Sequence, residues 1–382
     1  MREVFIIGSG MTPIGNHWKM GIRDLAVQAS LKALEDAGNP EIDYIVVANA
    51  LSGVIDGQEN LGSLVSDYLG MRGTPSLKVE AAGASGAAAA IVASSLVKSG
   101  MAENVLLVGV EKMTDYTALE DSNMALSTSI EREYEAFFGA TLESLHAMVM
   151  RAYMRKYGVE ENSFAAVPVL MHEHASTNPY AQFKFKLKRE SYMRSPYLAE
   201  PLKLLDAPSI GDGAAAVVIS SSKDSPGGAV KLTSWGQATD HISLYMREEL
   251  LEFPAVRLAV KRALERADLN LKEMSFFKIH DSSSVAALIE LEEMGLAERG
   301  KSLELVDSED SRRDGSTPIN PDGGLKARGH PLGATGVYQL AETHLQLTER
   351  AEGTQVNGAK RALLLSMGGI ASNVIVHVLE GV

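Results

Sequence analysis

The sequence predicts an α/β fold built from two similar halves, each an open sheet with helices on its faces. Short apolar runs alternate with amphipathic helical segments near both ends of the chain. The helical segment LAVQASLKALEDAG at residues 25–38 is echoed by PAVRLAVKRALERAD at residues 254–268. The openings GASG at 83–86 and GATG at 333–336 each precede a helix of small residues. This repetition in the same order indicates an internal duplication with a long period.

The first half is expected to alternate strands with helices. An amphipathic helix is predicted over Ile22–Ala37, because its apolar residues recur on one face and Gly38 closes it. The helix after Gly83 is so rich in alanine and glycine that we expect close packing on all its sides, and therefore a central position. The other predicted elements are strands at Val4–Ile7, Ile42–Val47, Ser76–Val79 and Asn104–Val108 and a helix at Leu61–Leu69.

The glycines after the first strand do not indicate a nicotinamide or flavin site. Gly8, Gly10 and Gly15 resemble the dinucleotide-binding pattern, but that pattern needs a glycine at position 13. Pro13 stands there and blocks the helix start that a pyrophosphate requires. We therefore expect no bound cofactor of this kind.

The second half repeats the strand–helix order, and a long segment without a counterpart separates the halves. The predicted elements are a helix at Pro254–Asp268, a strand at Phe276–Ile279, a helix from about Leu332, and strands at Ala362–Leu365 and Val374–Leu379. We therefore expect an N-terminal half at 1–113, completed by 210–225, and a C-terminal half at 226–382. Residues 114–209 are expected to form an inserted loop domain.

Composition excludes several classes of function. The formal net charge is −13, which argues against a general nucleic-acid binder. No apolar run reaches membrane-spanning length and the first residues enter a strand directly, so we expect a cytoplasmic protein that does not cross a membrane. The chain contains no cysteine, which excludes disulfides, thiolate metal sites and any cysteine nucleophile.

One stretch stands out as a candidate site, NPDGGLKARGHPLGATGVYQL at residues 320–340. A glycine-rich loop leads to His330, and Pro331 fits the first turn of a helix because its missing N–H is not needed there. His330 is therefore expected just outside a helix N-terminus, where free N–H groups favour a phosphate, a carboxylate or a developing oxyanion. A chance histidine at a helix entry is the alternative.

Several segments in combination resemble the thiolase superfamily, and more closely its archaeal and sterol-carrier-protein type, over nearly the whole chain. They are EAAGASGAAAA, GVEKM, NPYAQF, GDGAAAVVI, HDSSSVAALIELEEMG, NPDGGLKARGHPLGATG and SMGG. The resemblance implies a thiolase fold, in which the duplicated halves form a five-layer α-β-α-β-α sandwich and the inserted loop domain covers coenzyme A. It also implies a homodimer or a dimer of dimers, and a small accessory protein that combines an OB-fold with a zinc ribbon.

Thiolases use two cysteines, and here every position that resembles a thiol position holds another residue. The nucleophile position at the head of the small-residue helix is Gly83. The positions of the proton-transferring cysteine are Ser366, and Ser282 in the segment that resembles H-D-C-F. Ser282 and Ser366 are expected to handle protons rather than carry an acyl group, since an unactivated alcohol is a poor nucleophile. A cysteine introduced at position 83 is expected to recover acyl capture but not full turnover.

The resemblance carries over the family's polar residues. His330 matches the histidine that donates to the thioester oxygen, and His280 matches the other oxyanion-hole residue. Backbone N–H groups at Gly83 and Gly368 are expected to form a second oxyanion hole. Contacts to coenzyme A, as a substrate or ligand, are expected from Ser209, Lys184 and Arg189. The remaining histidines are expected to be surface or structural residues, with no metal site at the pair two residues apart: His17, His146, His172, His174, His241, His344 and His377.

Three functions remain open from the sequence. The first is carbon–carbon bond chemistry on an acyl-CoA by enolate stabilisation, as in a retro-aldol lyase. The second is a non-catalytic thiolase homologue that serves as a binding or complex subunit. The third is an acetyl-CoA acetyltransferase with a relocated nucleophile, against which the loss of every thiol position argues. Retention of His330 and His280 favours the first over the second.

Overall fold

The computed structural model describes residues 2–115 and 119–382, and nine hydrogen-bonded strands form its framework. Their order is β3-β2-β4-β7-β1-β8-β11-β10-β9. The first five positions in that order belong to the N-terminal half and the last four to the C-terminal half. The bounds are β1 (Phe5–Met11), β2 (Tyr44–Ala48), β3 (Ser76–Val79), β4 (Asn104–Glu111), β7 (Gly213–Ser220), β8 (Val230–Thr239), β9 (Phe276–Lys278), β10 (Arg361–Gly368) and β11 (Asn373–Gly381).

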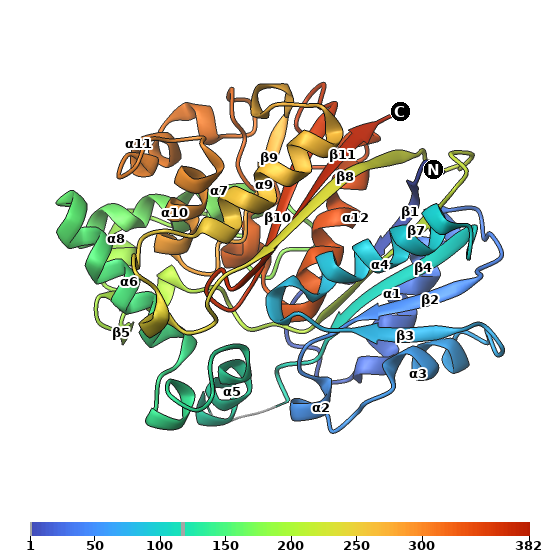
Figure 1. The fold of residues 1–382 in the computed structure, drawn as a ribbon, viewed down its shortest axis with the longest axis horizontal. Helices are drawn as coiled ribbons and strands as arrows, with labels where there is room; N and C mark the ends of the chain where they lie inside the picture. The colour runs from blue at the N-terminus through green and yellow to red at the C-terminus, as the bar shows by residue number, and fades with distance from the viewer. Residues whose placement is uncertain (1, 116–118) are drawn as a thin grey trace.

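The two half-sheets meet along a short seam. Strand β1 pairs with β8 only where Phe5 faces Lys231 and Ile6 faces Val230. By contrast, β1 pairs with β7 along most of its length, and β8 pairs with β11 along most of its own. Figure 1 shows the blue and cyan strands of the first half on the right and the yellow-to-red strands of the second half to their left. The sequence predicts two open halves, and the structure joins them through this seam.

Helices fill the space between the half-sheets and cover both outer faces. Between them lie α4 (Ser85–Ser99) and α12 (Thr335–Leu347), which share one apolar cluster with both half-sheets. The outer face of the first half-sheet packs on α1 (Ile22–Asp36) and α3 (Leu61–Tyr68). The second packs on α9 (Pro254–Ala267), beyond which lies α10 (Ser284–Met294). The predicted five-layer α-β-α-β-α arrangement is therefore confirmed.

The central helices approach each other closely because glycine stands at their crossing. A Cβ atom at Gly86 would lie 2.6 Å from the backbone nitrogen of Val337, and one at Gly336 would lie 2.6 Å from that of Ala87. Any larger residue at either glycine would push the two backbones apart. This contact explains why the sequence places small residues at the start of both helices, and it confirms the predicted central position of α4.

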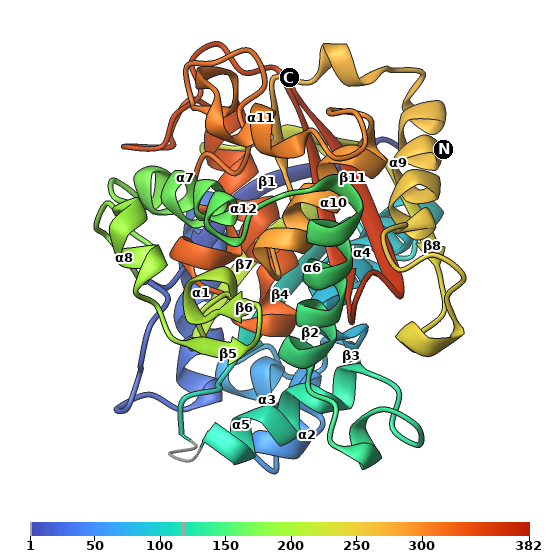
Figure 2. The ribbon, with the colours of Figure 1, turned by 90° about the vertical axis from the view of Figure 1, so that its left-hand side faces the viewer.

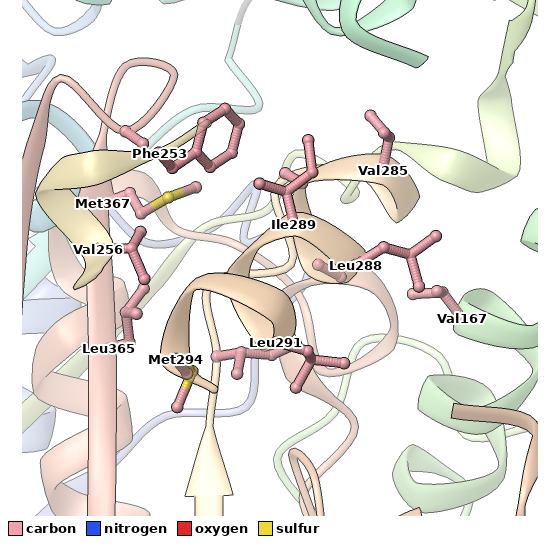
Figure 3. Packing of buried hydrophobic residues seen from close by; sticks show 14 of the residues in the cluster. Val167, Phe253, Val256, Val285, Leu288, Ile289, Leu291, Met294, Leu365 and Met367 are labelled. Atoms are coloured by element: carbon pink, nitrogen blue, oxygen red, sulfur yellow. The ribbon is translucent and has the colours of Figure 1, made fainter. Parts of the chain in front are cut away.

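Most of the described segment between β4 and β7 lies in front of the strands in the view of Figure 2, against the C-terminal half. Its first helix differs, because Ala125 and Leu126 pack with Leu51 and Met113 of the N-terminal half. Helix α10 is buried along its whole length between this segment and the second half-sheet. Figure 3 shows Leu288 of α10 beside Val167 on one side, with Val256 and Leu365 on the other. The segment comprises α5 (Leu119–Leu126), α6 (Leu142–Tyr157), α7 (Ala166–Ala175), α8 (Arg189–Met193) and the strand pair β5 (Tyr197–Ala199) and β6 (Leu202–Lys203).

The observed boundaries differ from the predicted ones in a few places. Residues 332–334 form a 3₁₀ turn, and α12 begins at Thr335 rather than at Leu332. Strand β8 and helix α10 are observed in the structure but are not among the elements predicted from the sequence. Two further short helices are observed that the sequence does not predict, α2 (Ser52–Ile55) after β2 and α11 (Ser302–Asp307) after α10. Among the described residues, no helix combines the length and apolar character needed to cross a membrane.

Candidate active site

A cavity of about 330 Å³ lies between the inserted segment and the loop that carries His330. Its lining is mainly apolar and brings together leucines from four parts of the chain, Leu126, Leu142, Leu198, Leu202, Leu204 and Leu332. Ser282, His146, Ser209 and His330 add polar groups to this lining. A larger groove of about 1130 Å³ lies on the surface beside α9, but none of the predicted site residues lines it. We therefore treat the His330 cavity as the candidate active site.

His330 is held in one orientation by its own loop. Its backbone N–H donates to the carbonyl of Ser209 over 3.3 Å, and its Nδ1 lies 2.7 Å from the hydroxyl of Thr335. Gly329 precedes it with a φ of 111°, a left-handed conformation that favours glycine. With Nδ1 engaged by Thr335, Nε2 is the ring nitrogen left for a ligand. Burial, and then the charge of Arg328, lower the pKa of His330 to about 3, so the ring is neutral near pH 7.

His280 packs against His330 but does not line the cavity. The two ring centroids are 5.2 Å apart and the rings are nearly perpendicular. The backbone N–H of His280 donates to Glu290 over 2.7 Å, while its ring Nδ1 is buried without a partner among the described residues. Burial lowers the pKa of His280 well below its ordinary value. Of the two predicted donors, the structure therefore brings only His330 to the cavity wall, and His280 stands in direct contact with it.

The aspartate next to His280 ties its segment to the His330 loop. Asp281 accepts hydrogen bonds from the Asn320 side chain over 2.9 Å and from the backbone N–H of Leu325 and Lys326 over 2.8 and 3.1 Å. Gly324 lies against this carboxylate with a φ of 55°, and a Cβ there would be 2.5 Å from Oδ1 of Asp281. Burial raises the pKa of Asp281 to about 6. The two motifs that the sequence singles out are thus one hydrogen-bonded unit.

The position that resembles the thiolase nucleophile is crowded by backbone and ring atoms. A Cβ at Gly83 would lie 2.5 Å from the carbonyl oxygen of Met367 and 2.9 Å from Nε2 of His280. This crowding argues against the expectation that a cysteine at position 83 recovers acyl capture, because the backbone at Met367 or the His280 ring would have to shift to admit its Cβ. A Cβ at Gly368 would likewise lie 2.5 Å from the carbonyl oxygen of Ala81. Neither Gly83 nor Gly368 is among the described residues that line the cavity.

The two serines at the other thiol positions have different surroundings. The hydroxyl of Ser366 is buried and donates to the side-chain oxygen of Gln339 on α12 over 2.7 Å. It therefore forms part of the central layer rather than of the cavity wall. Ser282 lines the cavity, and its hydroxyl lies 3.4 Å from Nε2 of His146. Only Ser282 of this pair is placed to meet a ligand.

His146 is the site residue that the sequence did not single out. It lies on α6, is 2 % exposed, and directs Nδ1 to the carbonyl of Leu142 over 3.0 Å. The sequence signal is a histidine on the apolar face of an amphipathic helix, next to Leu145, Val149 and Tyr153. Such a residue is usually structural, and nothing local reveals that it meets Ser282 across 136 residues of chain.

The residues expected to contact coenzyme A do not lie together. Ser209 lines the cavity and its carbonyl accepts from His330. The exposed Lys184 donates to the carbonyl of Pro179, and Arg189 forms an exposed ion pair with Asp307. Neither basic residue is among the described residues that line the cavity. If Lys184 or Arg189 contacts coenzyme A, it would therefore contact a part of the ligand that lies outside the cavity.

The histidine pair of α7 has separate partners. Nδ1 of His172 lies 3.2 Å from the carbonyl of Phe185, and Nδ1 of His174 lies 3.0 Å from that of Asn320. Within residues 2–115 and 119–382, no group of three or more His, Cys, Asp or Glu side chains is arranged to hold a metal ion. His344 is buried and bonded to Ser9 and Gly228.

We expect the ring signals of His330 and His146 not to titrate between about pH 5 and about pH 8. Burial lowers the pKa of His330 to about 3 and that of His146 to about 4, so both rings stay neutral throughout this range. NMR of ¹³C-labelled histidine rings measures this directly. The denatured protein is the control, since its rings should titrate near about pH 6.5. A midpoint above about pH 6 for either ring of the folded protein would contradict the buried, neutral state.

Both halves of the chain are similar to known proteins. The family profile described as "Thiolase, N-terminal domain" matches residues 4–223, and that described as "Thiolase C-terminal domain-like" matches residues 236–381. An acetyl-CoA acetyltransferase of Methanothermobacter thermautotrophicus is 38% identical over 386 residues, which cover 99% of this chain and 99% of that protein. Sterol carrier protein 2 of Gallus gallus is 31% identical over 385 residues, which cover 96% of this chain and 70% of that protein.

Among solved structures, one described as "Ltp2-ChsH2(DUF35) aldolase" superimposes on this fold with a TM-score of 0.85. The superposition covers 99% of this chain and 98% of that chain at 22% sequence identity. At that identity the likeness concerns the fold alone.

Proposed function

Because the chain belongs to the thiolase family, we propose that it binds an acyl-CoA thioester in the His330 cavity and stabilises the enolate of its acyl group. The thioester carbonyl would accept a hydrogen bond from Nε2 of His330, the free nitrogen of a ring whose Nδ1 is held by Thr335. A neutral donor in an apolar cavity stabilises negative charge that develops on that oxygen more strongly than the same donor in water. The observation that carries this proposal is the position of His330 in the cavity wall, with Nδ1 held by Thr335 and Nε2 left for a ligand.

The reaction that fits best is a retro-aldol cleavage. In that step the bond between Cα and Cβ of a β-hydroxyacyl thioester breaks, and its electron pair forms the enolate. The β-hydroxyl loses its proton and becomes the carbonyl of the released aldehyde or ketone, while the enolate takes a proton at Cα. No acyl-enzyme is needed, which suits a chain that has no cysteine and a Gly83 without space for one. An aldolase among the solved structures of the same fold supports this choice.

The proposal is tested by binding and turnover measured together. We expect calorimetry to detect acyl-CoA binding, and β-hydroxyacyl-CoA to be cleaved to a shorter acyl-CoA and a carbonyl compound. We expect acetoacetyl-CoA thiolysis to stay at the buffer rate and labelled acetyl-CoA to leave no label on the protein. Cleavage of acetoacetyl-CoA or a stable acetyl-protein would identify a relocated nucleophile. No binding of any acyl-CoA at about millimolar concentration would leave a scaffold subunit as the better reading.

Partners are part of the proposal. An accessory protein is supported by the solved aldolase, whose name joins Ltp2 to ChsH2(DUF35). We also propose that the chain forms a homodimer or a dimer of dimers and that residues 114–209 act as a separate loop domain over the ligand. Light scattering of the purified chain measures the homo-oligomer, and light scattering of the chain mixed with a candidate accessory protein measures the complex between the two.

A further inference from the structure

The proposed function leaves one polar contact of the cavity wall without a role, that between Ser282 and His146. Both side chains line the cavity that His330 lines, and they come from α6 and from the segment after β9. The contact is long, with 3.4 Å between Oγ of Ser282 and Nε2 of His146. A ligand group can therefore replace the serine hydroxyl at this nitrogen with little loss.

The tautomer of His146 follows from its other nitrogen. Nδ1 lies 3.0 Å from the carbonyl of Leu142, and a carbonyl oxygen can only accept a hydrogen bond. Nδ1 must therefore carry the proton, which leaves Nε2 of the neutral ring as an acceptor. Burial, with a smaller contribution from the charge of Arg247, lowers the pKa of His146 to about 4, so the ring is neutral near pH 7.

We propose that Nε2 of His146 accepts a hydrogen bond from the β-hydroxyl of the bound acyl chain, so that the cavity selects β-hydroxyacyl thioesters over β-ketoacyl and saturated ones. This inference rests on the proposed function, because it assumes that the acyl group occupies the His330 cavity. An acceptor nitrogen needs a donor, and of the three acyl groups only the β-hydroxyacyl group offers an O–H at that carbon. A β-ketone would place one acceptor against another.

The same nitrogen gives the retro-aldol proton a destination. As the bond between Cα and Cβ breaks, the β-hydroxyl proton passes to Nε2, and the electron pair moves into the enolate held by His330. The imidazolium then returns this proton to Cα, so that both proton and charge balance without a further reactant. Burial disfavours the imidazolium alone, but the enolate supplies a negative charge in the same cavity while it exists.

The size of the preference follows from one neutral hydrogen bond. Such a bond contributes a modest net free energy beyond the long contact with Ser282, so we expect β-hydroxyacyl-CoA to bind about five- to ten-fold more tightly than the matched saturated or β-keto ester. Calorimetry with three CoA esters of equal chain length measures this ratio in the wild-type protein.

Variants then assign the preference to one nitrogen. His146→Phe keeps the ring volume without the acceptor, so the preference should vanish while the saturated ester keeps its affinity within about two-fold. His146→Gln can present its side-chain oxygen near the former Nε2, so part of the preference should return. His172→Phe is the matched control, because His172 also directs Nδ1 to a backbone carbonyl but does not line the cavity; its preference should equal that of the wild type.

The possible failures are distinguishable. Equal affinities of the three esters for the wild-type protein, or a preference that survives in His146→Phe, would overturn this inference and leave the proposed function standing. If no acyl-CoA binds, the proposed function falls and takes the inference with it. If the His146→Phe protein does not fold, the ratio of the three ester affinities in the wild-type protein still tests the proposed selectivity.

Discussion

Replacement of His330 by alanine is expected to lower the rate of enolate chemistry in this cavity by about a hundred- to a thousand-fold, the usual effect of removing one oxyanion donor. The thioester oxygen gains negative charge only as the enolate forms, so the lost hydrogen bond matters most at that point. His330 is neutral and its Nδ1 is held by Thr335, so the ring is oriented before the ligand arrives. When the Thr335 hydroxyl donates to Nδ1, the ring proton stands on Nε2 and can be donated to the thioester oxygen. The affinity for the thioester should therefore change much less than the rate.

The measurement is deuterium incorporation at Cα of a bound acyl-CoA, followed by mass spectrometry, together with cleavage of β-hydroxyacyl-CoA. His330→Asn should retain more activity than the alanine variant because its amide keeps an N–H donor. His241→Ala removes an exposed histidine and serves as the control. We expect His280→Ala to lower the rate as well, through its contact with the His330 ring. A wild-type protein that shows neither exchange nor cleavage would make both histidines structural residues.

Substitution of Gly83 by cysteine is expected to destabilise the protein and to leave it without an acyl-enzyme. The new Cβ would lie 2.5 Å from the carbonyl oxygen of Met367, a backbone atom that cannot rotate away, and 2.9 Å from the His280 ring. Overpacking of this kind costs typically about 1–3 kcal/mol of unfolding free energy. The displaced His280 would also disturb the packing of His330, which its ring contacts.

Urea unfolding and trapping with labelled acetyl-CoA measure the two effects. Gly15→Cys is the matched control, since nothing lies within 4 Å of a Cβ at that position and its φ is not left-handed. It adds the same thiol with little change in stability expected. A Gly83→Cys protein with wild-type stability and a stoichiometric acetyl label would show that the backbone yields to the cysteine.

Much of the fold could be predicted from the sequence because the signals are local. Apolar runs mark β2 and β4, and the helix that Gly38 closes is observed as α1 with almost the predicted bounds. Strand β8 gives a weak sequence signal because its buried positions include Ser234 and Gly236 while Trp235 lies on the other face, so the apolar alternation of a half-buried strand is broken. Helix α10 gives a weak sequence signal because it is buried all round, and its glutamates Glu290, Glu292 and Glu293 are buried too rather than marking one exposed face.

The site could be predicted only where one motif carries it. His330 and its loop are contiguous, so the glycines and the proline indicate the turn that carries it, whereas the contact of Nδ1 with Thr335 is known only from the structure. Ser366 was expected near the chemistry, but it bonds to Gln339 in the central layer. His146 reaches the cavity only because the inserted segment folds back onto the C-terminal half. Contacts of that kind are made by tertiary packing and leave no pattern along the chain.

The crossing of α4 and α12 constrains how the two halves of this protein can diverge. Gly86 meets the backbone at Val337, and Gly336 meets the backbone at Ala87, so the crossing is the same from either half. Neither glycine can be enlarged, and a smaller partner cannot make room because the opposing residue is already glycine. Each copy of the ancestral unit therefore limits the substitutions open to the other at this point. The repeat of glycine at this point of both halves therefore has a steric reason, since each half needs glycine where it meets the backbone of the other.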